Sequence, residues 1–123
     1  MRINPNRHLD FSVHVAPNPD GGTHVGVYGE LDLATVDEVD AAFDQAVAAE
    51  GPVVIDLRAC GFVDSKGIAS LLKVALRLRE QDRDLMIQGV QQRVMETFER
   101  AGVTSMAHLA LEPQESRERS SGH

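Results

Sequence analysis

The fold is decided by one segment of the chain, residues 53–81, which reads VVIDLRACGFVDSKGIASLLKVALRLREQ. Its first five residues form a nearly continuous apolar run, which is typical of a short strand covered on both faces. Apolar residues at helical spacing then predict a long helix that ends near Gln81: Ile68, Leu71, Leu72, Ala75, Leu76 and Leu78. A buried strand followed by a helix indicates an α/β domain with parallel crossovers.

Periodic patterns on either side of this segment extend the prediction. Residues 11–15 and 25–27 alternate between apolar and polar, and the turn-rich stretch 17–22 between them predicts an antiparallel hairpin. Thr35 and Glu38 have the spacing of a capping box at the start of a helix over 35–50. A strand at 85–87, a helix over 91–101 ending at Gly102, and a short final strand with a little helix within 103–111 follow. We therefore predict an α/β fold whose mixed sheet opens with a hairpin and continues with alternating helices and strands.

Composition excludes several classes of function. A chain of 123 residues is the size of one domain, and its net charge of −7 lacks the basic footprint of a nucleic-acid binder. No stretch approaches the roughly 18 apolar residues of a transmembrane helix, and the first ten residues lack the apolar core of a signal peptide. We expect a cytoplasmic protein without direct nucleic-acid contact or membrane insertion.

Domain boundaries follow from the same patterns. We expect residues 1–9 to be an N-terminal extension, residues 10–111 to form the domain, and residues 112–123 to be a flexible tail. The last segment is rich in Ser, Glu and Arg and has no aromatic side chain, so it cannot bury enough surface to order itself.

The loop between the central strand and the long helix combines residues suited to recognition. Asp64 and Ser65 both suit a helix N-cap, and Gly67 allows the backbone to approach another surface closely. A helix N-terminus also accommodates a phosphate, because its free amides and dipole favour negative charge. If the neighbouring strand is parallel, Glu30 and Asp32 share this edge of the sheet, where ligands and partners of α/β proteins tend to bind.

Each of these residues also has a plainer interpretation. Asp64 and Ser65 can be helix caps and nothing more, and Glu30 and Asp32 can be solvated charges near a helix start.

Three other residues are weak candidates for a functional site. His14 and His24 share the polar side of the hairpin without a third metal ligand nearby in the sequence, and the single Cys60 is expected to be a buried apolar residue: both are weak candidates for a metal or redox site.

Two motifs together resemble a known family. Gly29-Glu30-Leu31-Asp32-Leu33 lies between a strand and a helix, and Ile55-Asp56-Leu57 is followed by Asp64-Ser65-Lys66-Gly67-Ile68. This pair is similar to the STAS domain, in particular to bacterial anti-sigma factor antagonists, over about residues 10–110. The family commonly has Ser or Thr immediately before the glycine, where this chain has Lys66, which leaves Ser65 as the one candidate acceptor in the loop.

The resemblance implies a regulatory binding protein that acts in transcription regulation and stress response. Its partner would be an anti-sigma factor serine kinase that phosphorylates Ser65, and a protein serine phosphatase would reset the switch. The remaining residues of the expected binding site are Glu30, Asp32, Asp64, Lys66 and Gly67. No cofactor is expected, because the nucleotide and Mg²⁺ would belong to the partner.

Two other functions stay open at this point. One is a STAS scaffold subunit of a lipid-transport ABC system or of a stress-signalling complex. The other is an enzyme, which the sequence disfavours because it contains no Gly-x-Ser-x-Gly elbow, no phosphate loop and no His-Glu-x-x-His motif.

Overall fold

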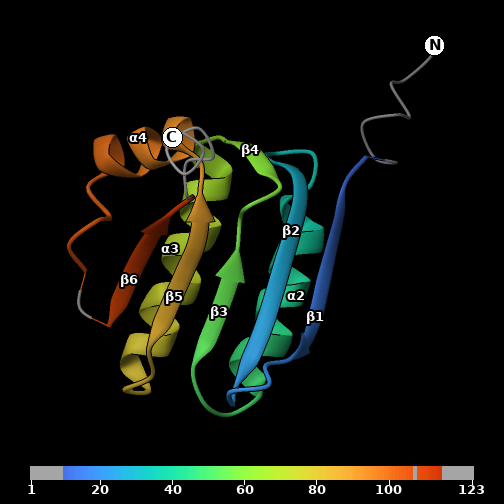
Figure 1. Ribbon diagram of the computed structural model, residues 1–123, viewed down its shortest axis with the longest axis vertical. Helices are drawn as coiled ribbons and strands as arrows, with labels where there is room; N and C mark the ends of the chain where they lie inside the picture. Colours follow the sequence, from blue (N-terminus) through green and yellow to red (C-terminus); the bar gives the residue numbers. More distant parts are fainter. Residues whose placement is uncertain (1–9, 107, 115–123) are drawn as a thin grey trace, which may run out of the picture.

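The computed structural model describes residues 10–106 and 108–114. Six strands form one sheet in the order β1-β2-β3-β5-β6, with β4 paired to β2 off this path (Figure 1). The elements follow the chain as β1 (Ser12–Pro17), β2 (Thr23–Leu31), α2 (Val36–Ala48), β3 (Val53–Asp56), β4 (Cys60–Val63), α3 (Ser65–Glu80), β5 (Leu85–Val90), α4 (Gln92–Ala101) and β6 (Leu109–Pro113).

The sheet is mixed, as the sequence predicts. β1 and β2 form an antiparallel hairpin in which Val15 lies opposite Val25. Every other pairing is parallel: β2 with β3, β2 with β4, β3 with β5, and β5 with β6. The carboxyl ends of β2 to β6 therefore meet at one edge of the sheet.

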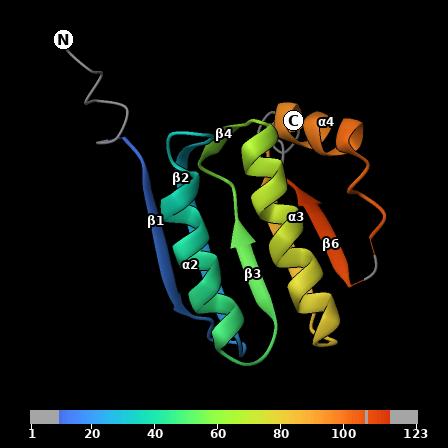
Figure 2. The same ribbon diagram turned by 180° about the vertical axis from the view of Figure 1, so that it is seen from behind.

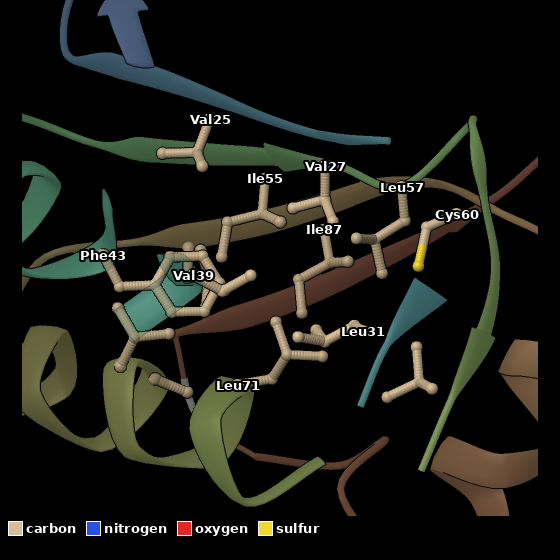
Figure 3. Close-up of a cluster of buried hydrophobic side chains, with 14 of the residues drawn as sticks. Val25, Val27, Leu31, Val39, Phe43, Ile55, Leu57, Cys60, Leu71 and Ile87 are labelled. Carbon is tan, nitrogen blue, oxygen red and sulfur yellow. The ribbon is translucent and has the colours of Figure 1, made fainter. Parts of the chain in front are cut away.

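The helices lie mostly on one side of the sheet. α2 and α3 run side by side over one face, and α4 lies at the carboxyl edge (Figures 1 and 2). The core fills the space between this face and the two helices, where side chains of β2, β3 and β5 point toward Phe43 of α2 and Leu71 of α3 (Figure 3). Among the described residues, no helix is both long and apolar enough to cross a lipid bilayer.

The central strand β3 is covered on one face only, so the expectation that both faces are covered is wrong. Val53 and Ile55 are fully buried against the helices, whereas Val54 and Asp56 alternate with them and remain half-buried. Strand periodicity sends alternate residues to opposite faces, and no helix packs over the second face in the described part of the chain.

β4 is absent from the sequence prediction because a bulge breaks its alternation. Gly29 pairs with Cys60, but the next residue of β2, Glu30, pairs with Phe62, so that Gly61 is an extra residue. As a result Cys60 and Val63 are both buried although they stand three apart. A bulge of this kind removes the period-2 signal that identifies a strand.

The ends of the chain partly agree with the prediction. α4 ends as expected at Gly102, which has a left-handed φ of 74°. β6, however, extends to Pro113, and the Gln114 amide donates to the Val90 carbonyl at 2.8 Å, so the ordered domain passes the expected boundary at residue 111. The predictions for residues 1–9 and for the rest of the tail, 115–123, concern residues outside the described part of the chain.

Candidate functional site

The two sequence motifs meet at the carboxyl edge of the sheet. β2 and β4 are parallel neighbours, with Leu31 opposite Val63, so Asp32 and Asp64 follow adjacent strand ends. The Asp64 amide extends this pairing by donating to the Leu31 carbonyl at 3.1 Å. The shared edge that the sequence predicts is therefore present, and it brings together residues 30–33 and 64–67.

Asp64 is the N-cap of α3 and also ties the two motifs together. Its Oδ1 accepts from the Gly67 amide at 2.9 Å, and its Oδ2 accepts from the Leu33 amide at 3.2 Å. The capping interpretation of Asp64 is thus confirmed. Because each carboxylate oxygen holds a backbone amide of a different segment, Asp64 fixes the start of α3 relative to the β2–α2 turn.

Asp32 lies inside the β2–α2 turn rather than in solvent. Its side chain is 5% exposed, and its Oδ1 accepts from the Ala34 amide at 3.0 Å. Thr35 completes the turn, since its hydroxyl donates to the Glu30 carbonyl at 2.7 Å and accepts from the Asp32 amide at 3.1 Å. The predicted capping box at Thr35 is wrong, because this hydroxyl is used by the turn and makes no cap hydrogen bond to α2.

Ser65 and Lys66 are the first two residues of α3, and both side chains are exposed. Gly67 behind them is buried against the strand ends. A Cβ at this position would lie 2.7 Å from the Leu31 carbonyl oxygen and 2.8 Å from Cγ1 of Val63. The close approach that Gly67 permits is therefore to its own sheet, and it presents Ser65 and Lys66 on a firmly seated helix start.

Two exposed apolar side chains at this edge are missing from the predicted site. Leu33 is 69% exposed in the β2–α2 turn, and Phe62 is 43% exposed on β4, paired with the exposed Glu30. Large apolar side chains in solvent often mark a contact surface. The signal for Leu33 is its position beyond the end of a strand, whereas Phe62 is recognisable only once β4 is known to be a strand.

The weaker candidates of the sequence do not form a site. His14 lies opposite Gly26, and His24 lies opposite Ala16, so the two histidines do not face each other across the hairpin. Among the described residues, no group of three His, Cys, Asp or Glu side chains could hold a metal ion. Cys60 is fully buried, and this burial raises the pKa of its thiol, so it is the unreactive apolar residue that the sequence predicts.

Comparisons with known proteins give the same family as the motifs. A family model described as "Mlab, STAS domain" matches residues 15–111. The anti-sigma-B factor antagonist of Staphylococcus aureus is 29% identical over 87 residues, which cover 69% of this chain and 80% of that protein.

Solved structures share the fold. An anti-sigma-factor antagonist (STAS) domain protein from Planctomyces limnophilus has a TM-score of 0.72 at 18% identity and covers 89% of this chain and 96% of its own. The Bacillus cell fate determinant SpoIIAA in its phosphorylated form has a TM-score of 0.64 at 15% identity, with 90% and 97% covered. The match of the family model spans most of the chain, and the chain therefore belongs to the STAS domain family.

Proposed function

We propose that this protein is an anti-sigma factor antagonist, which binds an anti-sigma factor serine kinase and is switched by phosphorylation of Ser65. The observation that carries the proposal is the exposed Ser65 at the first position of α3, at the edge where both motifs meet. The name of the Staphylococcus aureus relative supports the role. The phosphorylated SpoIIAA structure shows that a protein of this fold can carry a phosphoryl group.

In the unmodified state the site offers a preorganised surface to the kinase. Glu30, Leu33, Ser65 and Lys66 are exposed around one helix start, and the Asp64 carboxylate holds the backbone beneath them. Binding to a rigid surface loses less conformational entropy than binding to a mobile loop. We propose that Asp32, Asp64 and Gly67 contribute by shaping this surface.

Phosphorylation changes the charge of the site without unfolding it. The kinase transfers the terminal phosphoryl group of its nucleotide to Ser65 Oγ: the new O–P bond forms, the bond to the diphosphate breaks, and the hydroxyl proton passes to a base of the kinase. The phosphate adds about −1.5 to −2 charges at neutral pH, which the N-terminus of α3 accommodates. At a desolvated interface the same charge opposes binding and can cost several kcal/mol. A protein serine phosphatase restores the hydroxyl by hydrolysis.

Lys66 sets this loop apart from a loop with two hydroxyl acceptors. It leaves Ser65 as the acceptor of the loop, and its ammonium group can pair with a phosphate on Ser65. An exposed pair of this kind contributes only about 0–1 kcal/mol, so Lys66 should soften the switch without cancelling it. In this role the protein acts by binding rather than by catalysis, in the cytoplasm, where a sigma factor and its regulators meet.

Three variants test the proposal against the purified anti-sigma kinase. Ser65→Ala should bind the kinase and resist phosphorylation, and Ser65→Asp should stay folded but bind poorly. Glu30→Lys should weaken binding without changing the circular dichroism spectrum, because the side chain is exposed at the shared edge. The measurements are kinase-dependent labelling with mass-spectrometric site mapping and an affinity for each variant. Label on a residue other than Ser65, or full binding by Ser65→Asp, contradicts the switch.

A second candidate is the scaffold function within a lipid-transport ABC system or a stress-signalling complex. The observation that favours it is the description of the matching family model as "Mlab, STAS domain", which carries no anti-sigma name. A scaffold would hold its partner equally well whether position 65 is Ser, Ala or Asp. The same affinity series therefore separates the two functions.

A further inference from the structure

Three large apolar side chains are exposed among the described residues, and all three lie around the carboxyl end of β2. Tyr28 is 46% exposed on β2, Phe62 is 43% exposed on the neighbouring β4, and Leu33 is 69% exposed in the turn that follows β2. Single apolar side chains scattered over a surface need no explanation, whereas a cluster of them often marks a contact surface. We call these three residues the β2 patch.

The β2 patch reaches from the carboxyl edge onto the open face of the sheet. Tyr28 follows the buried Val27, so its side chain points away from α2 and α3. Phe62 pairs with Glu30, two residues beyond Tyr28 on the same strand, and therefore shares the open face with Tyr28. Strand geometry places the Cα atoms of Phe62 and Tyr28 about 8 Å apart. Figure 1 looks onto this face, with both helices behind the sheet.

The Tyr28 ring is held against the sheet. A Cβ at Gly26 would lie 3.1 Å from Cε1 of Tyr28 and 3.4 Å from its hydroxyl oxygen, so the ring covers the place where a side chain would otherwise stand. The His14 ring of β1 meets the Tyr28 ring edge to face, with 5.4 Å between the ring centroids. A side chain fixed in this way loses little conformational entropy on binding, which suits it to be an aromatic anchor of an interface.

The patch is continuous with the site of Ser65. Phe62 precedes Ser65 by three residues, which limits the distance between their Cα atoms to about 11 Å. The Leu33 amide donates to Asp64 Oδ2 at 3.2 Å, which fixes Leu33 beside the start of α3. A protein–protein interface of standard size buries about 800 Å² of each partner, which corresponds to a disc about 30 Å across. A protein that encloses the Ser65 hydroxyl therefore has room to cover the whole patch.

We propose that the β2 patch is the apolar part of the interface with the kinase that phosphorylates Ser65, so that the kinase reaches past the carboxyl edge onto the open face of the sheet. The inference rests on the proposed function and names a second contact surface of that partner. The kinase presents an apolar surface to Phe62 and Tyr28, because removing both side chains from water is favourable. A phosphate on Ser65 adds charge at the edge and leaves the patch unchanged, so the patch supplies affinity in both states.

Polar substitutions in the patch test the proposal with the intact chain and the purified anti-sigma kinase. Phe62→Gln, Tyr28→Gln and Leu33→Gln should each weaken binding about tenfold and raise the KM for phosphorylation of Ser65 by a similar factor. The kcat should stay within about twofold of the parent, because these contacts hold the ground state and the transition state alike. Met86→Gln, on the open face near the amino end of β5, is the matched control and should behave as the parent. Circular dichroism checks that each variant is folded.

The kinetic outcomes separate this inference from the proposed function. If the kinase binds the parent and labels Ser65 but treats Phe62→Gln and Tyr28→Gln as it treats Met86→Gln, the open face takes no part, and this inference fails while the switch stands. If the kinase neither binds the parent nor labels Ser65, the proposed function fails and the inference fails with it.

Two further measurements test other occupants of the patch. If the parent is a dimer that Phe62→Gln dissociates, the patch is an interface between copies and the inference is wrong. If removal of residues 1–9 lowers the melting temperature of the parent but not that of Phe62→Gln, those residues cover the patch, and the inference is again wrong.

Discussion

Gly67 shows how a single residue positions the site. Its missing side chain lets the first turn of α3 pack against the ends of β2 and β4, which the sequence predicts only as a close approach to some surface. The glycine allows a close approach, but the surface that it approaches is formed by the pairing of β2 and β4, which are far apart in the chain. The same is true of Asp32, whose burial depends on the turn that Thr35 closes and not on its own charge.

Replacing Gly67 with Ala should destabilise the domain. The new methyl would overlap the Leu31 carbonyl and the Val63 side chain, and overpacking of this kind costs about 1–3 kcal/mol. Gly61→Ala is the matched control, because its methyl would meet only the end of Gln91 at 3.7 Å. Urea denaturation of both variants measures the difference. Equal free energies of unfolding would contradict the tight packing of α3 on the strand ends.

At the scale of elements, local periodicity predicts most of the structure. The hairpin, the three helices and strands β3 and β5 each have a repeating apolar pattern, and the sequence indicates all of them within a few residues. β4 and the full length of β6 are missing from the sequence prediction because their pairing depends on other strands. Gly61 breaks the apolar alternation of β4, and the polar Glu112 interrupts the apolar pattern of β6 before the strand ends at Pro113. Edge strands and bulged strands are held by their neighbours more than by their own composition.

Truncation tests the true end of the domain. Removing residues 115–123 should leave the melting temperature nearly unchanged, because β6 ends before them. Removing residues 112–123 should lower it by several degrees. This larger deletion takes away the bond from the Gln114 amide to Val90 and the bond from Gln114 Nε2 to the Arg58 carbonyl at 3.1 Å. Calorimetry of the two truncated chains measures both melting temperatures. Identical values would place the domain end at residue 111, as the sequence alone suggests.

At the scale of the whole molecule, the residues of the proposed recognition site lie on one edge of the sheet. The carboxyl edge carries Ser65 and the exposed Leu33. The motifs of the sequence predict this edge, because both motifs follow strands. The exposed Phe62 could not be predicted as part of this edge, since β4 is recognisable only by its pairing with β2.

The charge of the molecule is also divided between its two covering helices. α2 contains Asp37, Glu38, Asp40 and Asp44 and no Lys or Arg, whereas α3, which begins at Ser65, contains four basic residues and one acidic residue. A chain with net charge −7 thus presents a cationic helix at its proposed interface. Opposed patches of this kind orient an approaching partner before contact.

The decisive measurement for the proposed switch at Ser65 is the affinity of the anti-sigma kinase for the phosphorylated protein. The protein is labelled by the kinase, its modification is mapped by mass spectrometry, and the dissociation constant is measured beside that of the unmodified protein in the same buffer. We predict one phosphate on Ser65 and an affinity lower by about a hundredfold or more, which corresponds to about 3 kcal/mol. A phosphate on another residue, or equal dissociation constants for the two forms, would contradict it.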